Sequence, residues 1–364
     1  MKYLSAPVEV GIELTNKCNL MCSHCYSSSG PGPAKLASEL RYEEIQKLID
    51  DLAGMKVFRL SLVGGEPFIR PEAVDIVRYG KQKGMAVVCS TNGYFLDDAK
   101  LRQLKAYGID NIQVSVDGGT FATHDKIRGR SGSFHIAVET ARKAKSFDIP
   151  ITIGTTLMTC NYTELPQIVE LARDLNADCL HLMCIQPGGR GMKDFYQRSP
   201  PDAAWIDMAR YLDEKRPEIE NSVPIKMQGG RFAFINKGVM KLPEQGQKTN
   251  EFDALFANCD CSKTRCVVDS TGNLLACDML RASDKNIRTT PFPEAWHTSE
   301  ILNRMRDRDA TTIDECIGCD YTSACMGGCA ASAYNIFGTI YAADPRCKIA
   351  DRIQDDEHEP TLQV

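Results

Sequence analysis

Between residue 8 and residue 215, short apolar runs rich in β-branched residues alternate six times with longer amphipathic runs. The short runs have the length and composition of parallel strands buried on both faces, and the longer runs have the apolar spacing of helices that cover such strands. Strands joined by helical crossovers form a parallel sheet. The sequence therefore predicts an α/β fold, with strands near residues 8–14, 57–63, 85–90, 111–116, 151–157 and 179–185 and helices near residues 40–52, 71–83, 97–107, 134–147, 165–175 and 201–215.

Three cysteines, Cys18, Cys22 and Cys25, follow the first of these strands with three and then two residues between them. Thiolates on so short a loop can converge on one metal centre. A mononuclear zinc site takes four ligands closed around the ion, whereas three thiolates suit a [4Fe–4S] cluster whose fourth iron is open to a ligand from outside the protein. The alternatives are a structural zinc knuckle and unliganded surface thiols.

Glycines and polar residues follow the later strands, at the edge where parallel-sheet enzymes carry their chemistry. Residues 64–67 read Gly-Gly-Glu-Pro, residues 90–93 read Ser-Thr-Asn-Gly, and residues 115–118 read Ser-Val-Asp-Gly. Each motif alone has the composition of an ordinary turn. Because they occur in order behind the triple-cysteine loop, they indicate one binding site, with the candidate residues Gly64, Gly65, Glu66, Pro67, Asn92, Ser115 and Asp117.

A second cysteine-rich region lies between residues 259 and 347. Two apolar segments, residues 267–269 and 274–276, flank a Ser-Thr-Gly-Asn turn and predict a β-hairpin that returns Cys277 toward the earlier cysteines. Eight thiolates from this region could ligate two further clusters. The candidates are Cys259, Cys261, Cys266, Cys277, Cys316, Cys319, Cys325, Cys329 and Cys347, of which one is surplus.

These motifs closely resemble those of the radical S-adenosylmethionine (SAM) enzymes. The resemblance implies a (β/α)6 partial TIM barrel. It further implies that the open iron of the first [4Fe–4S] cluster binds SAM, and that reductive cleavage of SAM yields a 5′-deoxyadenosyl radical. It also implies that residues 64–67 hold the methionine amino group, that Ser115 binds the ribose and carboxylate, and that Arg128 pairs with the methionine carboxylate. His24, just before the third cysteine, is also similar to the family's loop, and Arg190 lies in a segment similar to the Pro-x-Gly-Arg-Gly segment of several relatives.

The C-terminal cysteines resemble those of the SPASM extension, which carries two auxiliary [4Fe–4S] clusters and gives three clusters in all. The resemblance assigns Cys277, Cys329 and two of Cys259, Cys261 and Cys266 to the first auxiliary cluster. We expect Cys259 and Cys266 to be the pair, with Cys261 as the alternative. The second auxiliary cluster would be ligated by Cys316, Cys319, Cys325 and Cys347. A zinc ribbon is the alternative for Cys316 and Cys319 taken alone.

Asp278 directly follows Cys277. Anaerobic sulfatase-maturating enzymes have an aspartate at this position, as a proposed base that deprotonates the substrate. A carboxylate near a buried anionic cluster would have a raised pKa and would suit proton removal. The alternative is a solvated aspartate at the end of the hairpin.

The chain has 364 residues, a formal net charge of −5 and no secretion signal or long apolar run. We therefore expect a cytoplasmic protein that binds neither nucleic acid nor membranes. Sixteen cysteines in such a chain favour metal or redox chemistry over disulfides. The expected domains are the partial barrel (1–215), a bridging region without motifs (216–255), the SPASM domain (256–350) and a polar tail (351–364).

Most SPASM-containing members modify ribosomally made peptides, and others modify tetrapyrroles of the haem and haem d1 pathways. Several tetrapyrrole members lack hairpin cysteines that are present here, so we expect a precursor peptide that is oxidised, decarboxylated or cross-linked. The enzyme would need a flavodoxin- or ferredoxin-type electron donor. With only 17 residues before Cys18, it would also need a separate leader-peptide-recognition protein, unless it binds its substrate directly.

We expect the substrate, together with the bridge near residues 227–234, to close the cavity against water. The non-enzymatic alternative is an iron–sulfur electron-transfer protein. That alternative explains the cysteines but not the motif at residues 64–67, nor Ser115 and Arg128.

Overall fold

The computed structural model describes residues 3–31, 38–215, 218, 222–228, 259–319 and 322–347. Within these ranges nine strands form one sheet in the order β7-β6-β5-β4-β3-β2-β1-β8-β9. All neighbouring pairs are parallel except β8 and β9, which form an antiparallel hairpin. The strands are β1 (Glu9–Glu13), β2 (Arg59–Val63), β3 (Ala86–Thr91), β4 (Asn111–Ser115), β5 (Ile151–Leu157), β6 (Cys179–Cys184), β7 (Ile225–Gln228), β8 (Arg265–Val268) and β9 (Leu274–Leu275).

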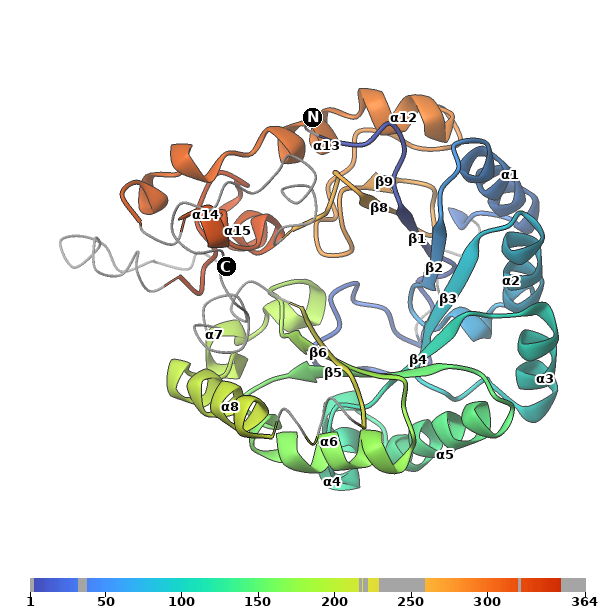
Figure 1. Cartoon of the computed structure of the whole chain (residues 1–364). Helices are drawn as coiled ribbons and strands as arrows, with labels where there is room; N and C mark the ends of the chain where they lie inside the picture. Colours follow the sequence, from blue (N-terminus) through green and yellow to red (C-terminus); the bar gives the residue numbers. More distant parts are fainter. Residues whose placement is uncertain are drawn as a thin grey trace.

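Helices cover the outer side of the curved sheet, as Figure 1 shows for α1, α2, α3 and α5. The barrel helices are α1 (Tyr42–Gly54), α2 (Ala73–Gln82), α3 (Asp98–Tyr107), α4 (Phe121–Arg128), α5 (Ser133–Ser146), α6 (Leu165–Asp174), α7 (Phe195–Arg198) and α8 (Asp202–Glu214). The C-terminal helices are α12 (Phe292–Thr298), α13 (Glu300–Asp307), α14 (Thr322–Cys325) and α15 (Ala330–Phe337). This arrangement confirms the predicted partial barrel.

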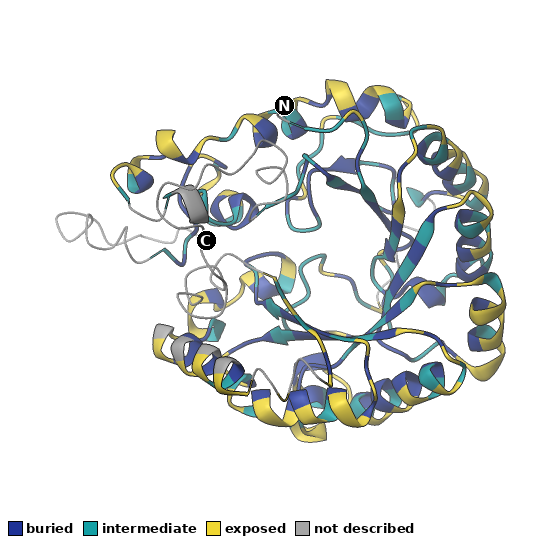
Figure 2. Cartoon of the chain, viewed as in Figure 1, coloured by how far each residue is buried: buried dark blue, intermediate teal, exposed yellow. Residues whose placement is uncertain are grey.

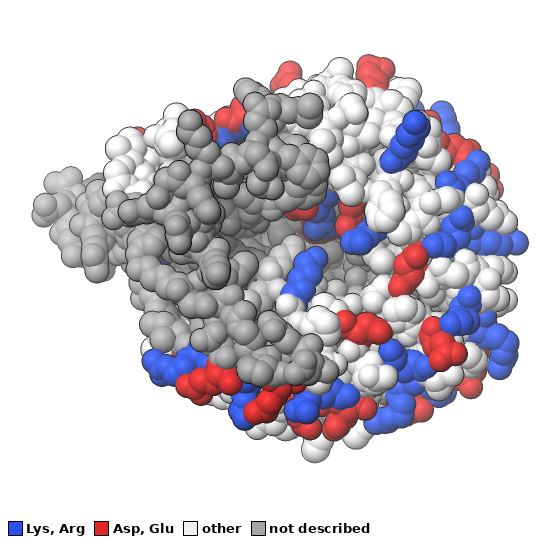
Figure 3. Space-filling view, viewed as in Figure 1, with Lys and Arg blue, Asp and Glu red and all other residues white. Residues whose placement is uncertain are grey.

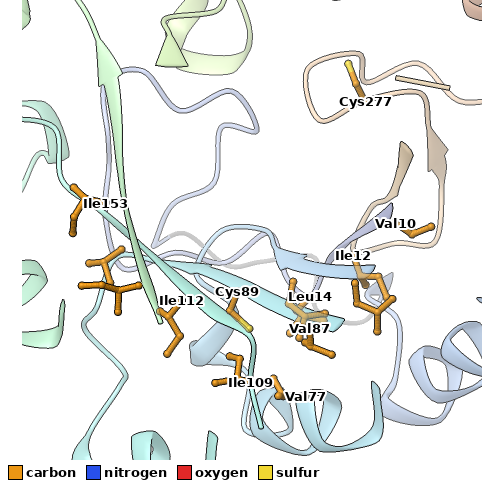
Figure 4. Packing of buried hydrophobic residues seen from close by; sticks show 14 of the residues in the cluster. Val10, Ile12, Leu14, Val77, Val87, Cys89, Ile109, Ile112, Ile153 and Cys277 are labelled. Carbon is orange, nitrogen blue, oxygen red and sulfur yellow. The ribbon is translucent and has the colours of Figure 1, made fainter. Parts of the chain in front are cut away.

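The hydrophobic core lies between the strands and the outer helices. In β2, Leu60 and Leu62 are fully buried against the helices, whereas Ser61 and Val63 face the inner side and are half-buried. The same alternation continues along β3 and β4, and Figure 4 shows Val87 and Ile112 among the packed side chains. The helices bury their inward faces and expose their outward faces (Figure 2). The inner side of the sheet is therefore more open and more polar.

Two strands lie where the sequence analysis did not place them in the sheet. Residues 225–228 were expected in a bridging region without motifs, but they form β7 and pair with β6. The predicted hairpin is present as β8 and β9, and β8 pairs in parallel with β1 on the edge opposite β7. The hairpin that carries Cys277 is therefore an extension of the barrel sheet. The expected closing bridge near residues 227–234 lies outside the described residues after residue 228, as does the polar tail.

Helices α4, α7 and the four C-terminal helices were not predicted. No described helix has both the length and the apolar character needed to cross a membrane.

Candidate active site

The loop after β1 carries Cys18, Cys22 and Cys25 and is held from several sides. The loop closes on itself through the Cys18 N–H, which donates to the carbonyl of Gly30 at 3.0 Å. The Ser23 N–H donates to the carbonyl of Ile127 in α4 at 2.9 Å. Cys18 and Cys22 are buried, and Cys25 is half-buried. The three thiols therefore sit on a fixed loop at the carboxyl end of the parallel strands.

Gly64 and Gly65 pack directly against the start of this loop. The Gly65 N–H donates to the carbonyl of Thr15 at 2.7 Å. A Cβ added at Gly65 would lie 2.2 Å from the carbonyl oxygen of Lys17, and one at Gly64, whose φ is +132°, would lie 2.5 Å from that of Thr15. Only glycine fits at these contacts. Gly64 and Gly65 therefore allow the close approach of the thiol loop.

Glu66 is fully buried and connects the ends of two strands. Its carboxylate accepts hydrogen bonds from the Thr91 hydroxyl at 2.8 Å and the Asn92 N–H at 2.7 Å. Burial raises the pKa of Glu66 to about 7, although these hydrogen bonds oppose the shift. Asn92 in turn donates from Nδ2 to the Cys18 sulfur at 3.7 Å. Glu66 thus fixes the turn that places Asn92 against the first thiol, and Pro67, also buried, follows it directly.

Arg128, at the end of α4, joins the second thiol to a buried carboxylate. Its Nη2 lies 2.7 Å from Oδ2 of Asp117, and its Nη1 donates to the Cys22 sulfur at 3.7 Å. His24 Nε2 lies 3.4 Å from the same Asp117 oxygen. Burial would raise the pKa of Asp117, but the Arg128 charge and further contacts hold the pKa below its ordinary value. The predicted residues His24, Asp117 and Arg128 therefore form one cluster behind Cys22.

Arg190 also contacts the thiol loop. Its Nε donates to the carbonyl of Cys22 at 2.8 Å, and its N–H donates to the carbonyl of Cys25 at 2.9 Å. Arg198 in α7, which the sequence analysis did not identify, donates to the carbonyl and hydroxyl of Ser23 at 2.9 and 2.8 Å. No motif surrounds Arg198, so no sequence signal could have identified it. Ser115 is half-buried at the end of β4, two residues before Asp117.

The residues around the loop fit an iron–sulfur cluster and a polar ligand. The buried atoms Asn19 Nδ2, His24 Nδ1 and Arg128 Nε have no hydrogen-bond partner in the described part of the chain. Burial raises the pKa of Cys18 to about 12 and also raises that of Cys22, so these thiols become thiolates only with compensating positive charge, as a metal supplies. Within the described ranges no three His, Cys, Asp or Glu side chains are placed to hold a single metal ion.

Four C-terminal cysteines gather at the end of the hairpin. Interaction with Cys259 and Cys277 raises the pKa of Cys261, and interaction with Cys261 lowers the pKa of Cys259 to about 7. The charges of Cys277 and Cys259 both act on Cys329, at the start of α15. Three of these residues match the expected set, while Cys261 occupies the place expected for Cys266. We call Cys259, Cys261, Cys277 and Cys329 the hairpin thiol group.

Cys266 lies apart from the other thiols. It is fully buried in β8, in register with Val10 of β1, and belongs to the main hydrophobic core. Burial raises its pKa, and the charged groups that act on it are Arg306 and Arg265 rather than any cysteine. Its surroundings are therefore those of a core thiol and differ from those expected for a cluster ligand.

The remaining C-terminal cysteines form a second group. The charges of Cys347 and Cys319 act on Cys316, and those of Cys347 and Cys316 act on Cys325. Cys316 and Cys347 also belong to one small hydrophobic cluster. This set matches the expected second set. We call Cys316, Cys319, Cys325 and Cys347 the distal thiol group.

Asp278 is paired with a cation from the hairpin. Arg265 Nη2 donates to Asp278 Oδ2 at 3.2 Å, and the Asp278 side chain is 21% exposed. Asp278 is therefore not a freely solvated aspartate. Arg281 and the buried Glu13 form a second ion pair, in which Arg281 donates to both carboxylate oxygens at 2.6 and 2.9 Å. Figure 3 shows acidic and basic side chains together in the hollow of the visible face.

The C-terminal part packs onto the end of β6. Gln186 Oε1 accepts a hydrogen bond from the Ser332 hydroxyl at 2.6 Å. Asn335 Nδ2 in α15 donates to the carbonyl of Pro187 at 2.7 Å and to that of Met279 at 3.2 Å. Asn335 thus bridges the barrel and the end of the hairpin. In Figure 1, α14 and α15 lie beside the open side of the curved sheet.

Comparison with known proteins places these features in a family. Residues 12–174 match the Radical SAM superfamily. The chain is 33% identical over 349 residues to the AdoMet-dependent heme synthase of Methanosarcina barkeri, with 94% of this chain and 97% of the relative covered. It is 28% identical over 374 residues to the mycofactocin maturase MftC of Mycobacterium ulcerans, with 99% and 94% covered.

A solved structure shares the fold. The crystal structure of Streptococcus suis SuiB bound to the precursor peptide SuiA matches with a TM-score of 0.75 at 14% identity, covering 94% of this chain and 76% of SuiB. The family match includes the triple-cysteine loop and the strand-end motifs, and the first relative covers nearly the full chain. The chain is an enzyme that uses a [4Fe–4S] cluster and SAM, and it belongs to the radical SAM superfamily.

Proposed function

We propose that this enzyme abstracts a hydrogen atom from a ribosomally made peptide, which is then oxidised, decarboxylated or cross-linked. The observation that carries the proposal is the pair of C-terminal thiol groups beside the barrel, with a complete set of hairpin cysteines. Similarity to a mycofactocin maturase over 99% of this chain supports the same choice. A flavodoxin- or ferredoxin-type protein would supply the electron, and a separate protein could present the peptide.

When bound, the first cluster and SAM supply a 5′-deoxyadenosyl radical. In this proposal Cys18, Cys22 and Cys25 hold that cluster, while Asn92 and Arg128 donate to the ligating sulfurs at the distances given above. The three unpartnered nitrogens of Asn19, His24 and Arg128 offer donors to the cluster or to the amino acid part of SAM. The motif at residues 64–67 and Ser115 complete the SAM site.

We further propose three clusters, with the hairpin and distal thiol groups each ligating one. The hairpin assignment replaces Cys266 with Cys261, because Cys259 and Cys277 both act on the pKa of Cys261 whereas Cys266 is buried in the hydrophobic core. Anaerobic reconstitution should then give about twelve iron atoms per chain.

The decisive variant changes Cys18, Cys22 and Cys25 together to Ala. About a third of the iron and all formation of 5′-deoxyadenosine should be lost, because only the first cluster holds SAM. The unchanged C-terminal thiols serve as the internal control. Continued formation of 5′-deoxyadenosine in this variant would refute the assignment. Wild-type protein that carries iron but never cleaves SAM would favour the electron-transfer alternative.

A tetrapyrrole substrate is the second candidate, because the relative at 33% identity is named AdoMet-dependent heme synthase. Anaerobic incubation with short peptides encoded beside the gene, followed by mass spectrometry, separates the two. Loss of two hydrogens or of carbon dioxide from a peptide supports the first candidate. Modification of a haem precursor, with every peptide unchanged, supports the second.

Asp278 would act as the base that accepts a substrate proton while the substrate radical gives up its electron to the hairpin cluster. The pairing of Asp278 with Arg265, beside Cys277, supports a position at that cluster. Asp278→Asn should abolish substrate turnover but leave uncoupled 5′-deoxyadenosine formation in place. Equal turnover in Asp278→Asn and wild type would remove Asp278 from the mechanism.

A further inference from the structure

Arg308, just after α13, fixes a tight turn between two cysteines. Residues 326–328, Met-Gly-Gly, have φ values of +53°, +74° and +70°, a run of left-handed residues. Their three carbonyls accept from the Arg308 guanidinium, that of Met326 at 2.7 Å and that of Gly327 at 3.0 Å. The same guanidinium donates to two carbonyls of the segment that leads to Cys347, those of Ile340 at 2.6 Å and Ala342 at 3.1 Å.

The turn held by Arg308 separates the two thiol groups defined above. Cys325 precedes the turn and belongs to the distal thiol group, whereas Cys329 follows it and belongs to the hairpin thiol group. Arg308 is within electrostatic reach of both groups. Burial lowers its pKa, and the charges of Cys259, Cys329, Cys316 and Cys325, two from each group, oppose that shift. An arginine stays protonated in proteins even so.

We propose that Arg308 is a shared positioning residue for the two auxiliary clusters, fixing the Cys325–Cys329 turn between them and raising the reduction potential of both. The proposal rests on the proposed three-cluster assignment. It concerns electron transfer between and out of the auxiliary clusters, not the choice of substrate.

The physical reason is the charge of a reduced cluster. Reduction adds one negative charge to a cluster that is already held by thiolates, and a fixed cation nearby stabilises the reduced form more than the oxidised form. The guanidinium has its hydrogen-bond donors directed at backbone carbonyls, so its charge is held in place by the turn. One cation that acts on both clusters shifts both potentials in the same direction.

The test is a potentiometric titration of the reconstituted enzyme, followed by electron paramagnetic resonance, with iron counted per chain. Arg308→Gln should shift both auxiliary potentials to more negative values and leave the potential of the Cys18, Cys22 and Cys25 cluster unchanged. Arg308→Lys retains the charge and should keep both potentials closer to wild type than to Arg308→Gln. Arg304→Gln, an exposed change in α13 one turn before Arg308, is the matched control and should shift neither.

Full iron with unchanged auxiliary potentials in Arg308→Gln would overturn the proposal. A shift in only one auxiliary cluster would also overturn it, because Arg308 would then serve one site. If Arg308→Gln does not load its C-terminal clusters, the iron content and potentials of Arg308→Lys test the proposal instead. Full loading at near wild-type potentials supports the proposal, and loss of either cluster overturns it. Formation of 5′-deoxyadenosine, measured separately, reports on the proposed function and is expected to persist in all three variants.

Discussion

At the residue scale, His124 shows how a buried side chain depends on one protonation state. The Asp117 N–H donates to His124 Nδ1 at 3.1 Å, so that nitrogen must be unprotonated. Burial, and then the nearby Arg128 charge, lower the pKa of His124 to about 4. The folded chain therefore disfavours the protonated form, which the unfolded chain accepts from about pH 6.5 downward.

We predict that the free energy of unfolding decreases as the pH falls below 6.5. Because the pKa of His124 is lower in the folded state, its contribution is complete above pH 6.5 and is lost as the pH falls toward 4, by up to about 3 kcal/mol. Denaturant unfolding of the reconstituted enzyme at several pH values measures this loss. In His124→Asn, whose amide oxygen can accept the same hydrogen bond without titrating, the slope between pH 6.5 and 4 should be smaller. An equal slope would contradict the role of His124.

A second residue-scale prediction separates two neighbouring cysteines. Cys261→Ala should remove about four iron atoms per chain, because it deletes one ligand of the hairpin thiol group. Cys266→Ala should retain the iron and instead lower the free energy of unfolding by roughly 1–3 kcal/mol, because it leaves a gap in a packed core. Iron analysis and denaturation of both variants make the comparison. If only Cys266→Ala lost iron, Cys266 rather than Cys261 would be the cluster ligand, as the cysteine spacing predicted.

The cysteines illustrate what the sequence could specify at this scale. The short spacings in the first loop and among the central cysteines predict that these thiols lie close together, because too few residues separate them for the chain to place them far apart. Spacing alone did not show that Cys266 would lie in a β-strand with its side chain buried in the core, so the expected pair of Cys259 and Cys266 could not be weighed against Cys261 from the sequence. Arg198 and Arg308 were missed, because an arginine that donates to distant carbonyls looks in the sequence like a solvated charge.

At the element scale, the predicted barrel strands and their major helices agree with the structure to within a few residues. Apolar periodicity carries that information, because a buried strand and an amphipathic helix each repeat a simple pattern. The pattern failed for α4, whose eight residues bury only His124, Ile127 and Arg128. It also failed for β7, a four-residue edge strand of alternating half-buried and exposed residues.

The turn after β2 gives a prediction at this scale. Gly65→Ala would place a Cβ 2.2 Å from the Lys17 carbonyl oxygen, and neither backbone can yield without moving the thiol loop. We expect loss of the first cluster, about four iron atoms, and a destabilisation of roughly 1–3 kcal/mol. The control is Gly54→Ala in α1, where a Cβ meets nothing within 4 Å. Normal iron content and SAM cleavage in Gly65→Ala would show that the loop can adapt.

At the scale of the whole molecule, α15 connects the barrel to the hairpin through Asn335. Asn335→Ala leaves two carbonyls without their donor, and we expect a loss of about 1–3 kcal/mol. Hydrogen exchange should become faster near residues 185–188 and 279–280 and stay unchanged in α2. Tyr334→Phe, an exposed change on the same helix, should alter neither. Uniform exchange in Asn335→Ala and wild type would mean that other contacts suffice for docking.

The pairing of β1 with β8 has a consequence for how the chain is made. Val10 lies in register with Leu60 on one side and with Cys266 on the other. One edge of β1 can therefore form its hydrogen bonds with β2 early in synthesis. The other edge has no partner strand until β8, more than 250 residues further on, has left the ribosome. During that interval the nascent chain exposes an unpaired parallel edge next to three reactive thiols. Newly made protein should therefore depend on chaperones, and on a reducing environment, until the hairpin arrives.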